Sequence, residues 1–570
     1  MTMTPTDEQR GAIEDELLSQ AIIACAGSGK TISAVRRVIE IRRRMKQKKG
    51  YVALLSYSNV AVDTFRAEYQ KLAKNYPGLS DRIVIATVDS FIATNILLPH
   101  GQRSMGCTVR PFLVHGGEPW LESFKIHNGS YPVSVRNLAV SVRGSDFVYA
   151  DVSSYGAPKP LANDVATAVI EKLARKGAYT HALARYWSLR TLVEQERLIK
   201  VLACRYPFVL IDEAQDVGSM HGTLVGLLED AGVTLSLIGD PNQAIYEFAD
   251  ADGSFLRSFS STAGRTWPLT QNRRSVSQIV AVANALSSSS SKEIRVAPAR
   301  KHGAYFLKYK QGEVQKLVDA FKAILSGHGY AEEEAAILCR GSALVDDILG
   351  GAAQTGSGAT ERLAQAAIYR DLRGDMAHSF QCAVEGVLRL MEDPPDRLHS
   401  EVLGSNPPAH AKAIRRLVWQ FLKQADSGLP ESALPARGEW HPRLKQRLPS
   451  LFEAIENVCS MKRAATWGNK LSTRDLADGP LLQRDMVSDG SIGIRIKTVH
   501  KVKGEGIDAV LFIAKKNDLD KMLAGTGTED GRIGYVAVTR ARDLLIVAIP
   551  ANTAPSVVSE LEAKGFSAWS

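Results

Sequence analysis

The 570-residue sequence predicts an α/β protein built from two parallel-sheet cores, each with a largely helical insertion. Three observations predict it. Apolar runs of strand length alternate with helical segments over the first ninety residues, the alternation resumes at Phe208, and it returns a last time at Ile492. Because strands that are separated by helices form parallel sheets, the two stretches that lack this alternation are expected to be insertions.

The first core is expected to comprise residues 1–99 and 200–268. Its opening part should hold strands and helices in turn, at 21–24, 32–44, 51–56, 60–72 and 83–87. Residues 100–199 lose this rhythm, with Gly, Pro and Trp in the first half and helical spacing in the second, and we expect a helical insertion there. Strands from Phe208 and at 235–239 then return the chain to the core.

The second core is expected at residues 269–349 and 490–570. Residues 350–489 between them are expected to form a helical insertion that opens with a linker-like stretch, GGAAQTGSGAT. Five apolar residues in this insertion fall at helical spacing: Ile414, Leu417, Val418, Phe421 and Leu422. Residues 410–450 carry eight Lys/Arg against three Asp/Glu, so a basic module on a flexible linker is expected.

Composition narrows the function. Hydrophobic residues make up 45% of the chain and charged residues 23%, which is typical of a folded globular protein. The net charge of +9 favours a polyanionic partner, although basic enzymes without one are common. No stretch reaches the ~18 consecutive apolar residues of a membrane helix, and no signal peptide opens the chain, so a cytoplasmic protein without a membrane partner is expected.

A phosphate-binding loop is predicted where ACAGSGKT follows a strand and precedes a helix. Its glycines let backbone N–H groups turn toward phosphate oxygens, Lys30 reaches the terminal phosphates, and the Thr31 hydroxyl can ligate Mg²⁺. A glycine-rich turn without a ligand is the alternative. The residues assigned to the nucleotide here are Gly27, Ser28, Gly29, Lys30 and Thr31.

Two adjacent acids, Asp212 and Glu213, end the strand that begins at Phe208. One carboxylate aimed at Mg²⁺ and the next aimed at a water supply metal ligation and a general base. Asp212 is therefore the expected metal ligand and Glu213 the expected base. Alone, such a pair is more often a solvated turn, but together with the phosphate loop it indicates hydrolysis of ATP with Mg²⁺ as the cofactor.

The ordered motifs resemble those of the UvrD/Rep/PcrA branch of superfamily 1 helicases. Besides the loop, they are TDEQR at 6–10, DEAQD at 212–216, IGDPNQAIYEF at 238–248, LTQNRRS at 269–275, TVHKVKG at 498–504 and YVAVTRAR at 535–542. Their order covers nearly the whole chain. The resemblance implies two RecA-like P-loop NTPase cores and an ATP-dependent helicase that moves 3′→5′ on single-stranded DNA and meets single/double-strand junctions.

The resemblance also implies roles for four residues. Gln9 would read the adenine and Gln243 would sense the γ-phosphate. Arg274 would be an arginine finger and Arg540 a second γ-phosphate contact. Two arginines from the second core, opposite the loop of the first, would place the nucleotide between the cores. Because Arg274 belongs to an Arg-Arg pair, a solvated helix start is the alternative for it.

The DNA-facing candidates lie at strand ends and in the later motifs. SYSN and TVDSF resemble the family's Phe-Thr-Asn and Thr-x-His-Ser-Phe, and the residues assigned to DNA are Tyr57, Asn59, Ser90, Phe91, Tyr246 and His500. Aromatic side chains stack on any base at ~1–3 kcal/mol each, and hydroxyl and amide groups hold phosphates. The aromatic residues can equally belong to the hydrophobic core. For Phe91, base stacking and a place in the core are equally expected.

Three departures separate the chain from the family pattern. Asp89 stands at the usual His, Arg273 at the usual Tyr near the nucleotide, and Glu505-Gly506 at the usual Leu-Glu. The family glutamate helps to bind the nucleotide sugar, and Glu505 is one position early for that role. These departures, with a short second insertion, resemble the compact UvrD-like helicases of anti-phage systems such as Gabija.

Two other functions compete with a helicase. One is a DNA-activated ATPase that serves as the sensing or regulatory subunit of a nuclease complex and unwinds little duplex alone. Because 28 residues follow Arg542, a nuclease is expected to act in trans. A metabolic P-loop kinase is disfavoured, since no acceptor site is indicated and the arginines of the second core would have no purpose.

Overall fold

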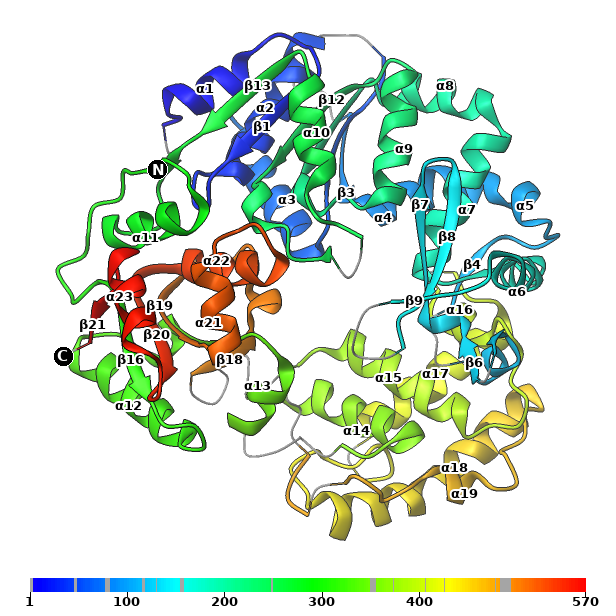
Figure 1. Cartoon of the computed structure of the whole chain (residues 1–570). Helices are drawn as coiled ribbons and strands as arrows, with labels where there is room; N and C mark the ends of the chain where they lie inside the picture. Colours follow the sequence, from blue (N-terminus) through cyan, green and yellow to red (C-terminus); the bar gives the residue numbers. More distant parts are fainter. Residues whose placement is uncertain are drawn as a thin grey trace.

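The computed structural model (Figure 1) describes residues 4–45, 49–76, 82–114, 118–129, 131–153, 158–247, 250–348, 355–372, 374–404, 406–424, 426–476, 478–481 and 494–569. The boundaries expected at 349/350 and 489/490, and Phe248 of IGDPNQAIYEF, lie outside these residues. Figure 1 places the first core at the top of the view, the second core at the left and the second insertion at the bottom.

The first core is a six-stranded parallel sheet in the order β13-β1-β12-β11-β2-β3. The strands are β1 (Gln20–Ala24), β2 (Val52–Ser56), β3 (Ile83–Thr87), β11 (Phe208–Asp212), β12 (Thr234–Gly239) and β13 (Arg265–Leu269). Inner strands such as β2 are buried along their whole length, as a sheet covered on both faces requires.

Helices cover both faces of this sheet. One face carries α1 (Asp7–Glu14), α2 (Lys30–Met45) and α3 (Asn59–Ala73), where Val38 and Phe65 share an apolar cluster with Ile22 and Leu54. The other face carries α9 (Ser219–Asp230) and α10 (Ser254–Thr262). The strands and helices predicted for the opening part of this core are confirmed to within a few residues.

The first insertion differs from the helical segment that the sequence predicts. Its helices are α5 (Leu98–Met105), α6 (Asn163–Arg175), α7 (His181–Glu194) and α8 (Glu196–Arg205). Its first half instead folds into short strands: β4 (Phe112–Leu113), β5 (Lys125–Asn128), β6 (Tyr131–Ser134), β7 (Leu138–Arg143), β8 (Asp146–Asp151) and β9 (Lys159–Pro160), and β4 pairs with β10 (Ala178–Tyr179). The reason is local: Arg143 pairs with Asp146 across a two-residue turn, where Gly144 has a φ of 62°.

The second core is also a six-stranded parallel sheet, in the order β18-β17-β19-β20-β16-β21. The strands are β16 (Gly303–Tyr309), β17 (Ala335–Cys339), β18 (Arg495–Thr498), β19 (Ile507–Ile513), β20 (Ala541–Pro550) and β21 (Ser567–Ala568). One face packs on α11 (Ser277–Ser287), α21 (Lys516–Leu523), α22 (Glu529–Arg540) and α23 (Pro555–Ala563), and the other on α12 (Val314–Gly327) and α13 (Ser342–Ile348). The predicted fold class, α/β with two parallel-sheet cores, is therefore confirmed.

The second insertion leaves the sheet after β17 and returns on the neighbouring strand β18, so the sheet closes without it. Its helices are α14 (Gly358–Asp371), α15 (Met376–Arg389), α16 (Leu398–Leu403), α17 (Ala409–Lys423), α18 (His441–Cys459) and α19 (Trp467–Lys470). They enclose an apolar cluster of their own around Trp440. The helical spacing at 414–422 corresponds to α17, whose Ile414 and Val418 are buried.

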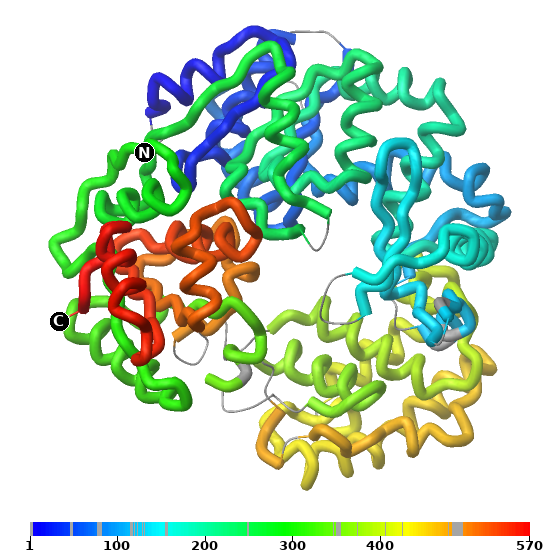
Figure 2. The backbone as a smooth tube through the Cα atoms, viewed as in Figure 1, coloured from blue at the N-terminus to red at the C-terminus, as the bar shows by residue number. Residues whose placement is uncertain are grey.

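The two insertions touch each other. Figure 2 shows the first (cyan) beside the second (yellow-green to orange) at the right of the view. Lys176 of the first insertion lies 2.9 Å from Asp396 of the second, and the Arg397 guanidinium lies 5.0 Å from the centre of the Phe112 ring. Figures 1 and 2 show the four parts of the chain arranged as a ring, in which each core carries its own insertion.

Candidate nucleotide and DNA site

The phosphate loop links β1 to α2. Gly27 and Gly29 have φ angles of 76° and 80°, a left-handed conformation that side chains disfavour. A Cβ atom on Gly27 would also lie 2.5 Å from Cβ of Arg274, so this glycine is required for close approach of the segment that carries LTQNRRS. Because α2 begins at Lys30, the free N–H groups of its first turn face the loop, as in other anion sites.

Gln9 ties the first helix to this loop. Its Oε1 accepts from the backbone N–H of Thr6 (3.0 Å), and its Nε2 donates to the carbonyl of Ser28 (2.8 Å). An amide side chain has two N–H donors and two acceptor lone pairs, so one of each remains for a ligand. That combination matches the exocyclic amine and ring nitrogen of an adenine edge.

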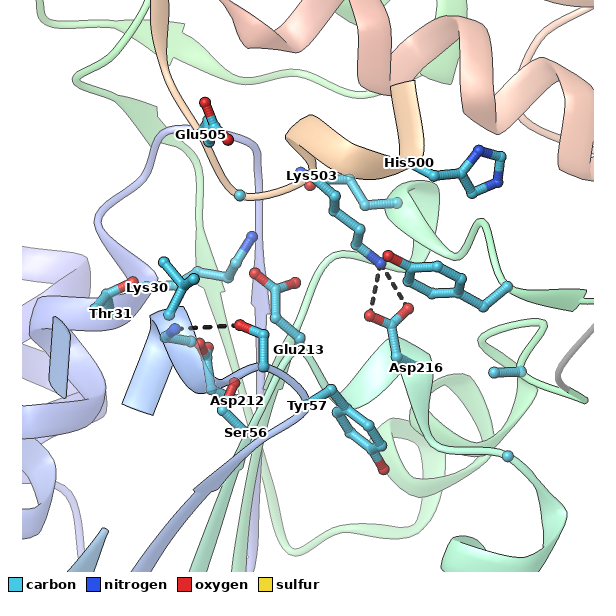
Figure 3. A pocket seen from close by; sticks show the side chains of 18 of the residues that line it. Lys30, Thr31, Ser56, Tyr57, Asp212, Glu213, Asp216, His500, Lys503 and Glu505 are labelled. Carbon is cyan, nitrogen blue, oxygen red and sulfur yellow. Dashed lines mark hydrogen bonds and ion pairs between the residues drawn. The ribbon is translucent and has the colours of Figure 1, made fainter. Parts of the chain in front are cut away.

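Asp212 and Glu213 lie at the carboxyl end of β11, facing the loop (Figure 3). Glu213 adopts a left-handed φ of 55°, a strained conformation that clusters at functional sites. Burial and then Glu213 raise the pKa of Asp212. Burial opposes ionisation of Glu213 as well, but Lys30 and then Lys503 outweigh it and lower the pKa of Glu213. Glu213 is therefore the acid that stays ionised and able to accept a proton.

The residues around Asp212 fit a bound Mg²⁺. Asp212 Oδ1 is buried and has no hydrogen-bond partner in the described part of the chain. The Thr31 hydroxyl lines the same cavity. Carboxylate and hydroxyl oxygens are ligands that Mg²⁺ takes in proteins, and a cation would neutralise the two adjacent acids.

A cavity of about 720 Å³ separates the two cores, a size that suits a small-molecule ligand. Its walls combine the phosphate loop, both acids and Gln243 of the first core with Arg274, Lys503 and Arg540 of the second. Tyr57, Tyr246 and His500 also line it. Apart from Lys503, the sequence assigned these side chains from separate motifs, and the fold brings them into one space.

Arg540, at the end of α22, is fully buried and reaches across to the first core. Its guanidinium donates to Gln243 Oε1 (3.1 Å) and to the carbonyls of Glu505 and Val536 (both 3.1 Å). Burial and then the neighbouring Arg274 lower its pKa to about 9. A cation in such a position is stabilised by an anionic ligand.

Arg274 lies in the cavity wall, ahead of α11, rather than on a solvated helix start. It donates to the carbonyls of Thr539 and Gly504 (both 3.3 Å), and burial lowers its pKa. Because these acceptors are neutral carbonyls and not carboxylates, they leave its charge available for a phosphate.

The DNA candidates divide into exposed and buried residues. Asn59 and Ser90 are exposed at the starts of α3 and of α4 (Val88–Ile92). Phe91 is 4% exposed and packs edge-to-face on Tyr206, with ring centres 4.8 Å apart. The structure thus favours the core interpretation of Phe91 over base stacking.

Tyr57, Tyr246 and His500 gather where the cores meet. The ring of Tyr246 lies 5.9 Å from that of His500, whose Nε2 is 3.1 Å from the carbonyl of Ile245. Tyr57 packs edge-on against His221 at 5.4 Å. Tyr246 and His500, assigned from motifs far apart in sequence, are therefore neighbours.

The departures from the family pattern have structural partners. Asp89 accepts two hydrogen bonds from Arg185 (2.8 and 2.7 Å) and lies 3.0 Å from His221, so a carboxylate here joins the first insertion to the core. Burial opposes ionisation of Asp89, but hydrogen bonds from His221 and Arg185 hold its pKa well below its usual value.

Glu505 pairs with Arg495 at 3.0 Å, and in Figure 3 it lies apart from Lys30 and Thr31. Its carboxylate is thus committed to an arginine of its own core. Arg273, at the usual tyrosine, donates to the carbonyl of Thr4 (3.0 Å).

Sequence reasoning missed one contact in the cavity. Lys503 Nζ lies 2.6 Å from both carboxylate oxygens of Asp216, the last letter of DEAQD (Figure 3). The signal was present, since each residue belongs to one of the ordered motifs, but neither motif alone shows that they meet.

Fold and cavity define the class: two parallel-sheet cores, a phosphate-loop motif on the first core and a shared cavity between the two. Comparison with known proteins narrows the class, because residues 161–264 match the family model described as the UvrD/REP helicase N-terminal domain. DNA helicase II of Salmonella typhimurium is 21% identical over 294 residues, which cover 49% of this chain and 40% of that protein.

Two further relatives match shorter segments. The RecBCD enzyme subunit RecB of Borreliella burgdorferi is 42% identical over 62 residues, 11% of this chain and 5% of RecB. An ATP-dependent helicase/nuclease subunit of Streptococcus uberis is 29% identical over 131 residues, 22% of this chain and 11% of that protein. In each case the match spans less than half the relative's length. Over these parts of its length, the chain is therefore similar to UvrD-like helicases.

Within the described residues, no helix has the length and apolar character needed to cross a membrane.

Proposed function

We propose that the chain is an ATP-dependent motor that moves 3′→5′ along single-stranded DNA and separates duplex at single/double-strand junctions. The observation that carries the proposal is the cavity between the cores, where Lys30 and Glu213 of one core face Arg274 and Arg540 of the other. Closing of the cores on a nucleotide would bring these charges together, and hydrolysis would release them.

Glu213 is the base in this proposal. Its carboxylate is held ionised beside Lys30 and can accept a proton from an attacking water. Arg274 and Arg540 would act on charge that develops on the transferred phosphoryl group. Mg²⁺, when held by Thr31 and Asp212, would supply positive charge to the phosphates. Gln9 would bind the adenine edge.

DNA would bind across the boundary between the two cores. Tyr246 and His500 lie there together, and Tyr57 lines the same cavity from the first core. Stacking on such rings is tolerant of base sequence, and the exposed Asn59 and Ser90 can hold phosphates. The net charge of +9 supports binding to a polyanion.

A DNA-activated ATPase that regulates a nuclease in trans is the second candidate. It is favoured by the streptococcal relative, whose name joins a helicase to a nuclease, and by RecB, which is named as a subunit of a larger enzyme. An anti-phage role of the Gabija kind stays a prediction from the sequence departures.

Two assays distinguish the candidates. ATP hydrolysis should be measured with and without single-stranded DNA, and strand displacement on duplexes with a 3′ or a 5′ tail. The motor predicts DNA-stimulated hydrolysis and displacement only from the 3′ tail. Stimulated hydrolysis without displacement from either tail would favour the regulatory ATPase, and hydrolysis indifferent to DNA would contradict both.

A further inference from the structure

The ion pair between Lys503 and Asp216 is the most buried charge contact that crosses between the cores in the described structure. Their side chains are 7% and 6% exposed, and both carboxylate oxygens lie 2.6 Å from Nζ. Asp216 closes the short 3₁₀ turn η4 (Ala214–Asp216), directly after the two acids of β11. Lys503 follows the 3₁₀ turn η9 (Val499–Val502) of the second core.

Lys503 also contacts Tyr246, the aromatic residue that lies where the two cores meet. Its ammonium lies 4.7 Å from the centre of the Tyr246 ring, within the range of a cation–π contact. His500, on the turn that leads into Lys503, packs against the same ring, with ring centres 5.9 Å apart. One side chain of the second core therefore joins the end of the acidic motif to the ring assigned to DNA.

The buried charges of this ion pair affect how firmly the two cores are held together. Burial raises the pKa of Asp216, and Lys503 works in the opposite direction. Removing either partner would leave the other as an uncompensated buried charge, which favours separation of the two cores.

We propose that Lys503 is a positioning residue that couples DNA at Tyr246 to the acidic end of β11, by holding the second core on Asp216. This inference rests on the proposed function. A base stacked on Tyr246 would stabilise the ring beneath the ammonium, and the ammonium would keep Asp216, with its adjoining acids, closed against the second core. Without DNA the same contact would form and break more readily.

The test compares ATP hydrolysis with and without single-stranded DNA in Lys503→Gln, Asp216→Asn, the double variant and Lys503→Arg. Lys516→Gln, an exposed lysine at the start of α21, is the matched control. Lys503→Gln should lower the stimulation by DNA about tenfold, a usual size for coupling between two sites, with a smaller change in the KM for ATP. Asp216→Asn should do the same, and the double variant should be no worse than either single one.

Lys503→Arg keeps the charge and should retain most of the stimulation, which distinguishes lost coupling from a failure to fold. Equal loss of rate with and without DNA in Lys503→Gln would show a merely structural role and overturn the inference. Full stimulation in Lys503→Gln would overturn it too, while leaving the proposed function intact. If the parent protein is not stimulated by DNA, the proposed function and the inference both fail.

Discussion

Replacing Arg540 by alanine should abolish most turnover while leaving ATP binding largely intact. The guanidinium is buried beside Arg274 and reaches Gln243 across the cavity, so it is placed to meet charge that develops on a phosphoryl group. An arginine finger contributes 10³–10⁵ in rate, or about 4–7 kcal/mol. Because Lys30 and Arg274 remain in the variant, we expect the lower end, about 10³ in kcat.

The same change also affects stability. It leaves Gln243 Oε1 and the carbonyls of Glu505 and Val536 without this donor, at about 1–3 kcal/mol for each buried acceptor. Removal of a desolvated charge offsets part of that cost, since burial already lowers the pKa of Arg540 to about 9. A net loss of about 1–3 kcal/mol in the free energy of unfolding is therefore expected.

The assay is steady-state hydrolysis at saturating DNA, with ATP affinity measured separately by a fluorescent analogue. Arg542→Ala is the control, because Arg542 is a neighbouring, half-exposed arginine that pairs with Asp508. A folded Arg540→Ala protein with kcat within about threefold of the parent would refute the reasoning. A rise in the dissociation constant for ATP as large as the fall in kcat would reassign Arg540 to ground-state binding.

Three further outcomes are expected. Lys30→Ala should abolish both ATP hydrolysis and tight ATP binding, whereas Glu213→Gln should keep ATP binding and lose hydrolysis. If Glu213→Gln hydrolyses ATP at the parent's rate, Glu213 is not the base. Asp89→Asn should cost about 1 kcal/mol at pH 7, since the pair with Arg185 is one third exposed and screened by water. The pKa of Asp89 is lower in the folded protein than in the unfolded chain, so this stabilisation is present above the unfolded pKa of about 4 and is lost as the pH falls from there toward the folded pKa. In chemical denaturation, the difference in the free energy of unfolding between variant and parent should therefore shrink toward zero as the pH is lowered below about 4. Replacing residues 355–481 by a short linker should preserve DNA-stimulated hydrolysis, because β17 and β18 are adjacent strands of the second sheet. The same replacement should raise the rate of unwinding. A folded variant whose hydrolysis is not stimulated by DNA would show that the second insertion is part of the motor.

Local sequence patterns were enough for the two sheets and for the phosphate loop. The strand at 52–56 is a continuous apolar run bounded by turns, and such runs need no distant partner to be recognised. The hairpin of β7 and β8 was missed because its strands alternate only weakly and lie next to helical segments. Its Gly-Ser turn was the available signal.

Contacts across the cavity could not be predicted, because they depend on how the two cores dock. Lys503 and Asp216 lie 287 residues apart, and no pattern in either segment specifies the other. A charge count likewise does not show which partners the basic side chains of the second insertion take. Arg415 donates to the carbonyl of Val402 and Arg443 pairs with Glu439, so part of the basic excess at 410–450 is engaged within the insertion.

Directional displacement of streptavidin from end-labelled single-stranded DNA tests the central claim most directly. A motor that moves 3′→5′ should displace streptavidin from a 5′-biotinylated oligonucleotide, with ATP and Mg²⁺, and leave it on a 3′-biotinylated one. The Glu213→Gln variant should leave streptavidin on both oligonucleotides. Displacement from the 3′ end, or equal displacement with and without ATP, would contradict the account.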